Sequence, residues 1–140
     1  MEFTHAFYDA LPPEAAAIRQ AVFVEEQGFQ EEFDATDRHA MHLLLFADGR
    51  SVGTLRAFTE DGGTRWHIGR VAVIKSARQL HLGRRMMDLA EAELRRRGAA
   101  GIEVSAQCRV QPFYEKCGFT SVGEVYLDEF CPHIRMVKEL

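Results

Sequence analysis

Short apolar runs bounded by turn residues predict an antiparallel β-meander in the first half of the chain. Met41–Ala47 and Ser51–Thr59 flank Asp48-Gly49-Arg50, and a turn sequence between two apolar runs is the strongest local sign of a hairpin. Asp61-Gly62-Gly63 forms a second expected turn, which leads into the Val- and Ile-rich run Trp66–Ile74. We therefore expect three consecutive antiparallel strands.

Two further patterns predict helices. After a short expected strand near Glu2–Tyr8, the prolines of Leu11–Glu14 suit a helix start, and an Ala-rich stretch continues to about Val24. From Leu82 to Arg97 the apolar residues recur at helical spacing along one arc, and Gly98 supplies a stop. This second stretch is the strongest helix of the chain.

The last third of the chain predicts a strand, a short helix and a final hairpin. Apolar and polar residues alternate over Gly101–Gln107, a short helix is expected near Pro112–Lys116, and strand-like segments run to Leu140. Because a helix connects Trp66–Ile74 to Gly101–Gln107, these two strands are expected to be parallel neighbours. The pattern indicates a mixed α and β (α+β) fold.

The composition fits one domain spanning residues 1–140. Hydrophobic residues make up 46% of the 140 and charged residues 27%, which is enough to bury one core. No apolar run approaches the roughly 18 residues of a membrane span and the N-terminus lacks a secretory signal, so we expect a cytoplasmic protein without membrane contact. Three cysteines without metal or redox spacing argue against a disulfide scaffold.

Two segments carry unbalanced charge. Residues 25–37 hold six acids and no base, so something cationic is expected to meet them. Residues 75–97 hold seven bases against three acids, so something anionic is expected there, although either segment also fits an ordinary solvated face. The net charge of −4 argues against a general nucleic-acid binder, and the arginines near residue 96 simply complement the dipole of a helix end.

The loop from Lys75 to Gly83 is a candidate anion site. It joins an expected strand to the start of the strongest helix, where free backbone N–H groups and the positive helix end suit phosphate oxygens. Arg78, Arg84 and Arg85 add full positive charges. Many such turns bind nothing, so the loop alone leaves both interpretations open.

Several groups of residues occur in a combined order and spacing that is specific, although each one alone is weak. Val71-Ala72-Val73 precede Arg78 and Gly83, and Phe113-Tyr114 follow the strand end at Gln107. With these segments the chain resembles the GNAT superfamily of acyl-CoA N-acyltransferases. The runs at residues 18–27, 34–37 and 132–136 are similar to its YjcF-like branch of small bacterial members.

The resemblance implies an open, mostly antiparallel sheet of six or seven strands, with helices on both faces and a parallel, splayed central strand pair. The sheet would open after the strand that ends near Ile74, and acyl-CoA would lie in the opening. In this family, backbone N–H groups at Val71 and Val73 would meet the pantetheine and the acyl carbonyl. The full set of implied cofactor residues is Val71, Ala72, Val73, Arg78, Gln79, Leu80, His81, Leu82, Gly83, Arg84, Gln107, Phe113 and Tyr114.

His81 departs from the family pattern, which has its central glycine at this position. A Cβ here narrows the approach of the backbone to a pyrophosphate and disfavours any left-handed conformation that the turn needs. Histidine tolerates a positive φ better than β-branched residues do, and its side chain is also able to touch a phosphate. We therefore keep the expectation of acetyl-CoA as the acyl donor.

Transfer of an acyl group from a thioester to an amine needs a proton for the departing thiolate and a base for the amine. Tyr114 fits the first task, because the reference pKa of a phenol is near 10 and that of a thiol near 8.5, so a phenol beside the sulfur is able to donate a hydrogen bond or a proton as charge develops. Tyr114 also fits an ordinary aromatic residue at a helix start. No residue stands out as the base. Glu26 is favoured because it lies in the acidic segment, and the other candidates are Glu103, Asp128, Glu129 and His133.

These features predict an acetyl-CoA-dependent N-acetyltransferase that acts on a primary amine of a small molecule or peptide by direct attack in a ternary complex. The alternative is a non-catalytic acyl-CoA binding or sensing module. Asp34, Asp37, His39 and His42 group oxygen and imidazole ligands, but their spacing matches no metal-site pattern, so no metal is expected. The partner set is then an amine substrate without nucleic acid, and the protein is expected to be a monomer or a homodimer.

Overall fold

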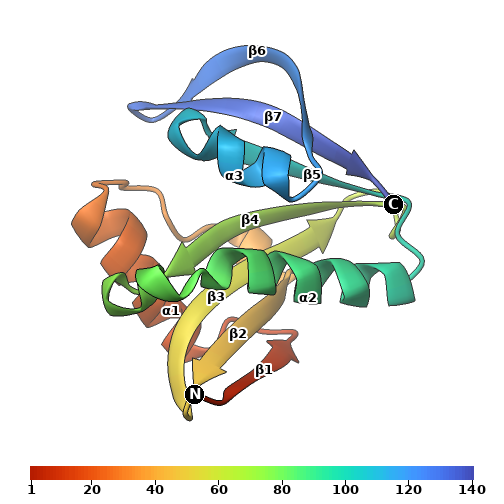
Figure 1. Cartoon of the computed structure of the whole chain (residues 1–140). Helices are drawn as coiled ribbons and strands as arrows, with labels where there is room; N and C mark the ends of the chain where they lie inside the picture. Colours follow the sequence, from red (N-terminus) through yellow and green to blue (C-terminus); the bar gives the residue numbers. More distant parts are fainter.

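One seven-stranded sheet organises the protein. The computed structural model describes residues 1–140, and the strand order across the sheet is β1-β2-β3-β4-β5-β7-β6 (Figure 1). Every neighbouring pair is antiparallel except β4 and β5, which are parallel as expected. The strands are β1 (Phe3–Tyr8), β2 (Met41–Ala47), β3 (Arg50–Thr59), β4 (Arg65–Val73), β5 (Gly101–Gln107), β6 (Thr120–Asp128) and β7 (Cys131–Glu139).

Three α-helices accompany the sheet, together with short 3-10 and π segments. The α-helices are α1 (Pro13–Arg19), α2 (Leu82–Arg96) and α3 (Gln111–Lys116). The 3-10 segments are η2 (Ala35–Arg38), η3 (Lys75–Leu80) and η4 (Cys108–Val110). None of these helices is both long and apolar enough to cross a bilayer.

The first helix departs from the expected single α-helix to Val24. The α-helical hydrogen bonding ends at Arg19, and a π-helix, η1 (Gln20–Glu26), continues the segment. The wider π turn brings residues five apart onto one side, so Ile18 and Phe23 are both buried in the same cluster.

The core forms on both faces of the sheet because side chains alternate along each strand. In β2, Leu43 and Leu45 pack in a cluster with Met86 of α2, whereas Leu44 packs with Ile18 on the other face. Helix α2 crosses one face, which is turned toward the viewer in Figure 1, and α1 covers the opposite face. The helices therefore lie on both faces, as the family resemblance implied.

The sheet opens inside β4, earlier than the expected position after Ile74. Pairing of β4 with β5 runs from Arg65 to Ile68 and stops there, although β4 stays paired with β3 as far as Val73. A bulge lies at the stop: Arg70 and Val71 together oppose a single β3 residue, and Arg70 has a φ of 53°. The bulge bends β4, and Figure 1 shows β4 and β5 diverging away from the C-terminus.

A buried ion network fixes the acidic segment to the sheet. Arg19 is 1% exposed, and its guanidinium donates to Glu32 Oε2 at 3.0 Å and to the Asp37 oxygens at 2.8 and 3.0 Å. Asp37 also accepts from Arg56 Nη1 at 2.9 Å. Removing one partner of such a buried set leaves an uncompensated charge, which is costly.

Two further contacts complete this network. Arg56 binds Asp34 at 2.7 Å, and Arg70 of the bulge binds Glu32 at 2.9 Å and Asp34 at 3.4 Å. The acidic segment was expected to meet a cationic partner. For Glu32, Asp34 and Asp37 that partner is a set of arginines of the same chain. Their charge is spent on the fold and leaves little for an external partner.

We expect acid to weaken the fold through Asp37. The Arg19 and Arg56 hydrogen bonds outweigh the effect of burial and lower the pKa of Asp37 from 3.8 to about 2. Because the pKa of Asp37 is lower in the folded than in the unfolded state, its ionised form stabilises the fold above pH ~3.8. About 2 kcal/mol of the free energy of unfolding is lost as the pH falls toward 2. The free energy of unfolding in urea, measured from pH 5 to pH 2, should show this loss in the wild type.

Two variants check the origin of that loss. Asp37→Asn should be less stable at pH 5 by several kcal/mol, and its difference from the wild type should shrink by about 2 kcal/mol toward pH 2. Asp9→Asn removes an exposed carboxylate outside the network and should follow the wild type. A difference between Asp37→Asn and wild type that stays constant with pH contradicts this account.

Candidate active site

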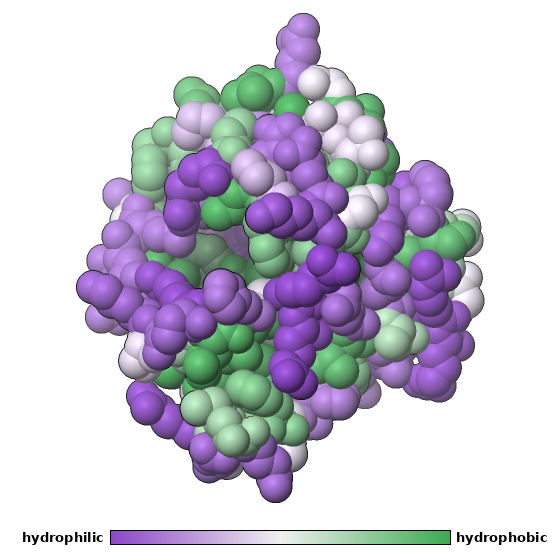
Figure 2. Space-filling model, in the orientation of Figure 1, coloured by the Kyte–Doolittle hydropathy of each residue, from purple (hydrophilic) through white to green (hydrophobic).

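The opening between β4 and β5 holds two adjoining cavities. The first, of 670 Å³, is lined by the start of α2 and by α3, and we call it the helix-side cavity. The second, of 310 Å³, is lined by the loop after η1 and by the turn between β6 and β7, and we call it the loop-side cavity. Five residues line both cavities, namely Gln27, Val71, Arg109, Val110 and Tyr114. In Figure 2 a hollow with a hydrophobic floor and a hydrophilic rim marks this region of the surface.

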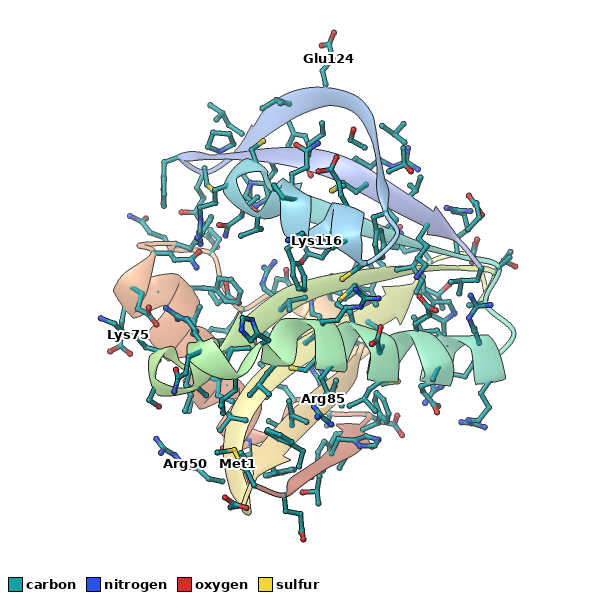
Figure 3. The ribbon with its side chains drawn as sticks, viewed as in Figure 1. Met1, Arg50, Lys75, Arg85, Lys116 and Glu124 are labelled. Atoms are coloured by element: carbon teal, nitrogen blue, oxygen red, sulfur yellow. The ribbon has the colours of Figure 1, made fainter.

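The helix-side cavity presents free backbone groups and positive charge. Beyond Ile68 one edge of β4 has no strand beside it, so backbone groups along Val71–Val73 are open to a ligand. The first turn of α2 adds unpaired N–H groups and the positive end of the helix dipole. Lys116 lines the cavity, whereas Lys75, at the start of η3, lies at the outer edge of the molecule (Figure 3).

His81 adopts a left-handed conformation, which its side chain was expected to disfavour. Its φ and ψ are 56° and 44°, it ends η3, and it immediately precedes α2. Its N–H donates to the Arg78 carbonyl at 3.4 Å, and its side chain lines the helix-side cavity. The turn therefore uses a conformation that glycine adopts at lower cost than histidine.

Gly83 allows the two helices beside the helix-side cavity to approach each other. A Cβ at this position would lie 3.1 and 3.2 Å from two ring carbons of Phe113 in α3. Both residues line the cavity. The absence of a side chain at Gly83 thus sets the width of the cavity at the start of α2.

Ten of the thirteen residues predicted to bind cofactor line the helix-side cavity, and the other three do not. Gln107 instead lines the loop-side cavity, while Gln79 and Leu80 line neither. The ten are Val71, Ala72, Val73, Arg78, His81, Leu82, Gly83, Arg84, Phe113 and Tyr114. The loop and the Phe113-Tyr114 pair are thus brought together from segments about 30 residues apart.

Tyr114 stands where the two cavities meet. It is 8% exposed, and the rings of Phe113 and Phe119 pack edge-on against it with centroids 5.0 and 5.9 Å away. Burial, and secondarily the nearby Cys117, raises the pKa of Tyr114 well above its usual value. Its hydroxyl therefore keeps its proton at neutral pH. No group of the protein forms a hydrogen bond with this hydroxyl.

Glu26, the favoured candidate for the base, is bound to a predicted cofactor residue. Its two carboxylate oxygens each accept from Arg78 at 2.8 Å, and Arg78 Nε donates to the Val73 carbonyl at 3.1 Å. The Arg78 hydrogen bonds lower the pKa of Glu26, and Glu26 lines neither cavity. A carboxylate engaged in this way is a poor proton acceptor, so the structure argues against this role.

The other four base candidates all line the loop-side cavity. Arg135 binds Glu103 at 2.8 Å and lowers its pKa, and Glu129 accepts from the backbone N–H groups of Gln30 and Glu31 at 3.0 Å. Asp128 has no partner. His133 Nδ1 lies 2.9 Å from the Cys131 carbonyl oxygen. The topology thus gathers groups from β5, the final turn and β7 that lie up to 30 residues apart.

Gln27, Arg70 and Arg109 also line the site, and none of them was singled out from the sequence as a site residue. Gln107 Nε2 donates to Gln27 Oε1 at 2.9 Å, and Arg109 Nε donates to Gln107 Oε1 at 2.9 Å. This chain of contacts crosses the opening between the N-terminal and C-terminal parts of the sheet. Arg70 of the bulge also lines the loop-side cavity. No local pattern marks these residues, because the Gln27–Gln107 contact joins segments 80 residues apart and the cavity forms only when those segments pack.

The residues weighed as metal ligands have other partners. Asp34 and Asp37 bind arginines, and His42 Nε2 lies 3.0 Å from the Asp37 carbonyl oxygen. The ring of His39 packs edge-on against Phe58. No group of three His, Cys, Asp or Glu side chains is arranged to hold a metal ion.

Comparison with known proteins agrees with this geometry. The sequence profile described as "Acetyltransferase (GNAT) domain" matches residues 9–140. The chain is 32% identical to the uncharacterized N-acetyltransferase YjcF of Bacillus subtilis over 129 residues, which covers 90% of this chain and 91% of YjcF.

Solved structures show the same fold. An acyl-CoA N-acyltransferase from Pseudomonas aeruginosa is 30% identical, with a TM-score of 0.83 and 98% of each chain covered. Escherichia coli ElaA is 27% identical, with a TM-score of 0.85 and 99% of each chain covered. The chain belongs to the GNAT acetyltransferase family, whose members use acetyl-CoA to acetylate amines.

We expect His81→Gly to stabilise the fold. Glycine adopts φ near 56° without the strain that histidine carries there, so the free energy of unfolding should rise by about 1 kcal/mol. His81→Val should lower it, because β-branched residues tolerate this region least. Urea unfolding of the three proteins measures the order, and a glycine variant less stable than wild type would contradict it.

Proposed function

We propose that the protein is an acetyl-CoA-dependent N-acetyltransferase that acetylates a primary amine in a ternary complex. The donor would bind in the helix-side cavity and the amine in the loop-side cavity. The observation that carries this proposal is the pair of cavities that meet at Val71 and Tyr114. Direct transfer needs such a two-sided site, because nucleophile and thioester must approach within about 3 to 3.5 Å.

The residues of the helix-side cavity fit a diphosphate nucleotide thioester. The left-handed turn at His81 and the unpaired N–H groups at the start of α2 suit phosphate oxygens, and Arg84, Arg109 and Lys116 add positive charge. The open edge of β4 along Val71–Val73 suits an extended amide chain. When bound, acetyl-CoA supplies the activated acyl carbonyl.

Tyr114 is the residue we assign to the departing thiolate. Its raised pKa keeps the hydroxyl protonated, and its position at the junction lets it hydrogen-bond to a sulfur placed between the cavities. As charge develops on sulfur, the phenol is able to donate its proton, which is general acid catalysis. The surrounding Phe rings exclude water and hold the hydroxyl in place.

The charges of the loop-side cavity support a cationic acceptor. Of the five carboxylates that line it, Glu32 and Glu103 are paired with arginines, whereas Glu31, Asp128 and Glu129 form no ion pair and leave negative charge in the cavity. An alkyl amine near pKa 10.4 arrives mostly protonated at pH 7, so it is attracted to such a site. The lining charged residues are Glu31, Glu32, Glu103, Asp128 and Glu129 with Arg56, Arg70 and Arg109.

Donor binding is tested by calorimetric titration of the protein with coenzyme A and acetyl-CoA. Wild type and His81→Gly should both bind. Gly83→Val should bind at least about tenfold more weakly, because its side chain pushes the Phe113 ring into the cavity. Arg95→Ala lies far along α2, binds only Glu91, and is the matched control. Absence of heat at millimolar ligand in wild type and His81→Gly would end the donor assignment.

Turnover of Tyr114→Phe tests the general acid. The variant should fold and bind coenzyme A as wild type does, while kcat falls by about 10²-fold or more because the leaving thiolate lacks its proton donor. Release of coenzyme A thiol over an amine panel measures kcat. An unchanged kcat removes this role from Tyr114, and donor binding without turnover of any amine by wild type would favour a binding or sensing module.

A further inference from the structure

His133 lies at the end of the loop-side cavity nearest the junction. In the sheet it pairs with Gln107, the last residue of β5, and with Tyr126 of β6. His67 also lines this cavity, but it pairs with Glu103, four residues earlier along β5. Four residues of strand correspond to roughly 13 Å, so His133 is much nearer the junction than His67.

The ring of His133 is held in one orientation. It is 6% exposed, with the Tyr126 ring stacked against it at 6.0 Å and the Phe29 ring edge-on at 6.4 Å. Tyr126 is in turn hydrogen-bonded to the Ser105 hydroxyl. Packing on both sides fixes which ring nitrogen turns toward the cavity.

The backbone selects the tautomer of this histidine. Nδ1 lies 2.9 Å from the Cys131 carbonyl oxygen, which is able only to accept, so the neutral ring carries its hydrogen on Nδ1. Nε2 then has a lone pair, and it has no hydrogen-bond partner within the protein. This is the arrangement that a general base needs.

The other titratable groups of the cavity are engaged or are weak bases. Glu32 is held by Arg19 and Arg70, and Glu103 by Arg135. Glu129 accepts two backbone N–H groups, which lower its pKa. Glu31 and Asp128 are exposed carboxylates, and a solvated carboxylate is a weak base toward an ammonium group. His133 is the imidazole nearest the junction, and its Nε2 is bound by no group of the protein.

We infer that His133 is the general base that takes the proton from the acceptor amine. The inference rests on the proposed function. The ammonium group gives one proton to Nε2 and becomes neutral, and its nitrogen then forms the C–N bond to the acyl carbon. The C–S bond breaks with its electron pair on sulfur, and Tyr114 gives that sulfur a proton. Tyr114 regains a proton from the new amide nitrogen, and His133 returns its proton to solvent.

The groups that face His133 come from every neighbouring element. Tyr126 and Asp128 belong to β6, and Cys131 to β7. Glu129 lies in the final turn, Glu31 in the loop after η1, and Gln107 and Arg109 near the end of β5. Protonation of Nε2 removes the lone pair, so the rate should fall in acid.

The test is the pH dependence of kcat/KM for wild type, His133→Gln, His67→Gln and His39→Gln. Wild type is first assayed with n-butylamine, tyramine, putrescine and glycine ethyl ester, and the amine that it acetylates best is used as the probe. Mass spectrometry identifies the amide product. At pH 7 His133→Gln should lose about 10²-fold or more. Its deficit should shrink toward pH 10, where the amine loses its proton without help. His39→Gln lies outside both cavities and should match wild type.

Each outcome decides one of two questions. Three outcomes overturn the base assignment but leave the proposed function intact. They are a loss of kcat/KM in His133→Gln that is the same at every pH, an unchanged kcat/KM in His133→Gln, and a pH-dependent loss in His67→Gln instead. Acetylation of none of the four amines by wild type overturns both. Nitrogen NMR of the neutral protein provides an independent readout, because the inference requires hydrogen on Nδ1 of His133, and hydrogen on Nε2 overturns it.

Discussion

The pairing between β4 and β5 ends at Ile68 and Val104, and both cavities of this protein depend on that ending. A parallel pair in the middle of a sheet normally satisfies its backbone groups along the whole strand. Here the bulge at Arg70 bends β4 while β3 still holds its other edge, so the free groups of Val71–Val73 face a cleft. A ligand is then able to meet the backbone at the centre of the sheet.

The strained bulge is held in place by charge. Arg70 has a positive φ, a conformation that persists only where the surroundings enforce it, and its guanidinium is bound by Glu32 and Asp34. The same carboxylates bind Arg19 of α1 and Arg56 of β3. The network therefore links α1, the acidic segment, β3 and the bulge, and its geometry fixes the wall of the loop-side cavity.

The two cavities divide the chemical task. The helix-side cavity offers backbone N–H groups and basic residues, and the loop-side cavity offers mostly carboxylates. Under the proposed function, a negatively charged donor and a positively charged acceptor would be guided to opposite sides of one junction. Tyr114 lies on α3 and His133 on β7, so both proton-transfer groups proposed here come from the C-terminal part of the chain.

The sequence by itself determined the features that are local. The turns at Asp48-Gly49 and Asp61-Gly62-Gly63, the helix beginning at Leu82 and the parallel crossover all follow from the spacing of neighbouring residues, and the structure confirms them. The sequence also showed that a histidine at position 81 disfavours a left-handed turn, but only the structure shows that His81 adopts one. The resemblance to the family rested on segments of this kind.

Only the tertiary structure decided which distant charges meet. Glu26 binds Arg78, which is 52 residues away, and Arg19 binds Asp37, which is 18 residues away. The sequence predicted a cationic partner for the acidic segment but not that arginines of the same chain supply it. The tautomer of His133 likewise depends on a carbonyl and two rings that packing brings together. Periodicity records which face of an element is apolar. It does not record the partner of a polar group, because that partner depends on how the elements pack.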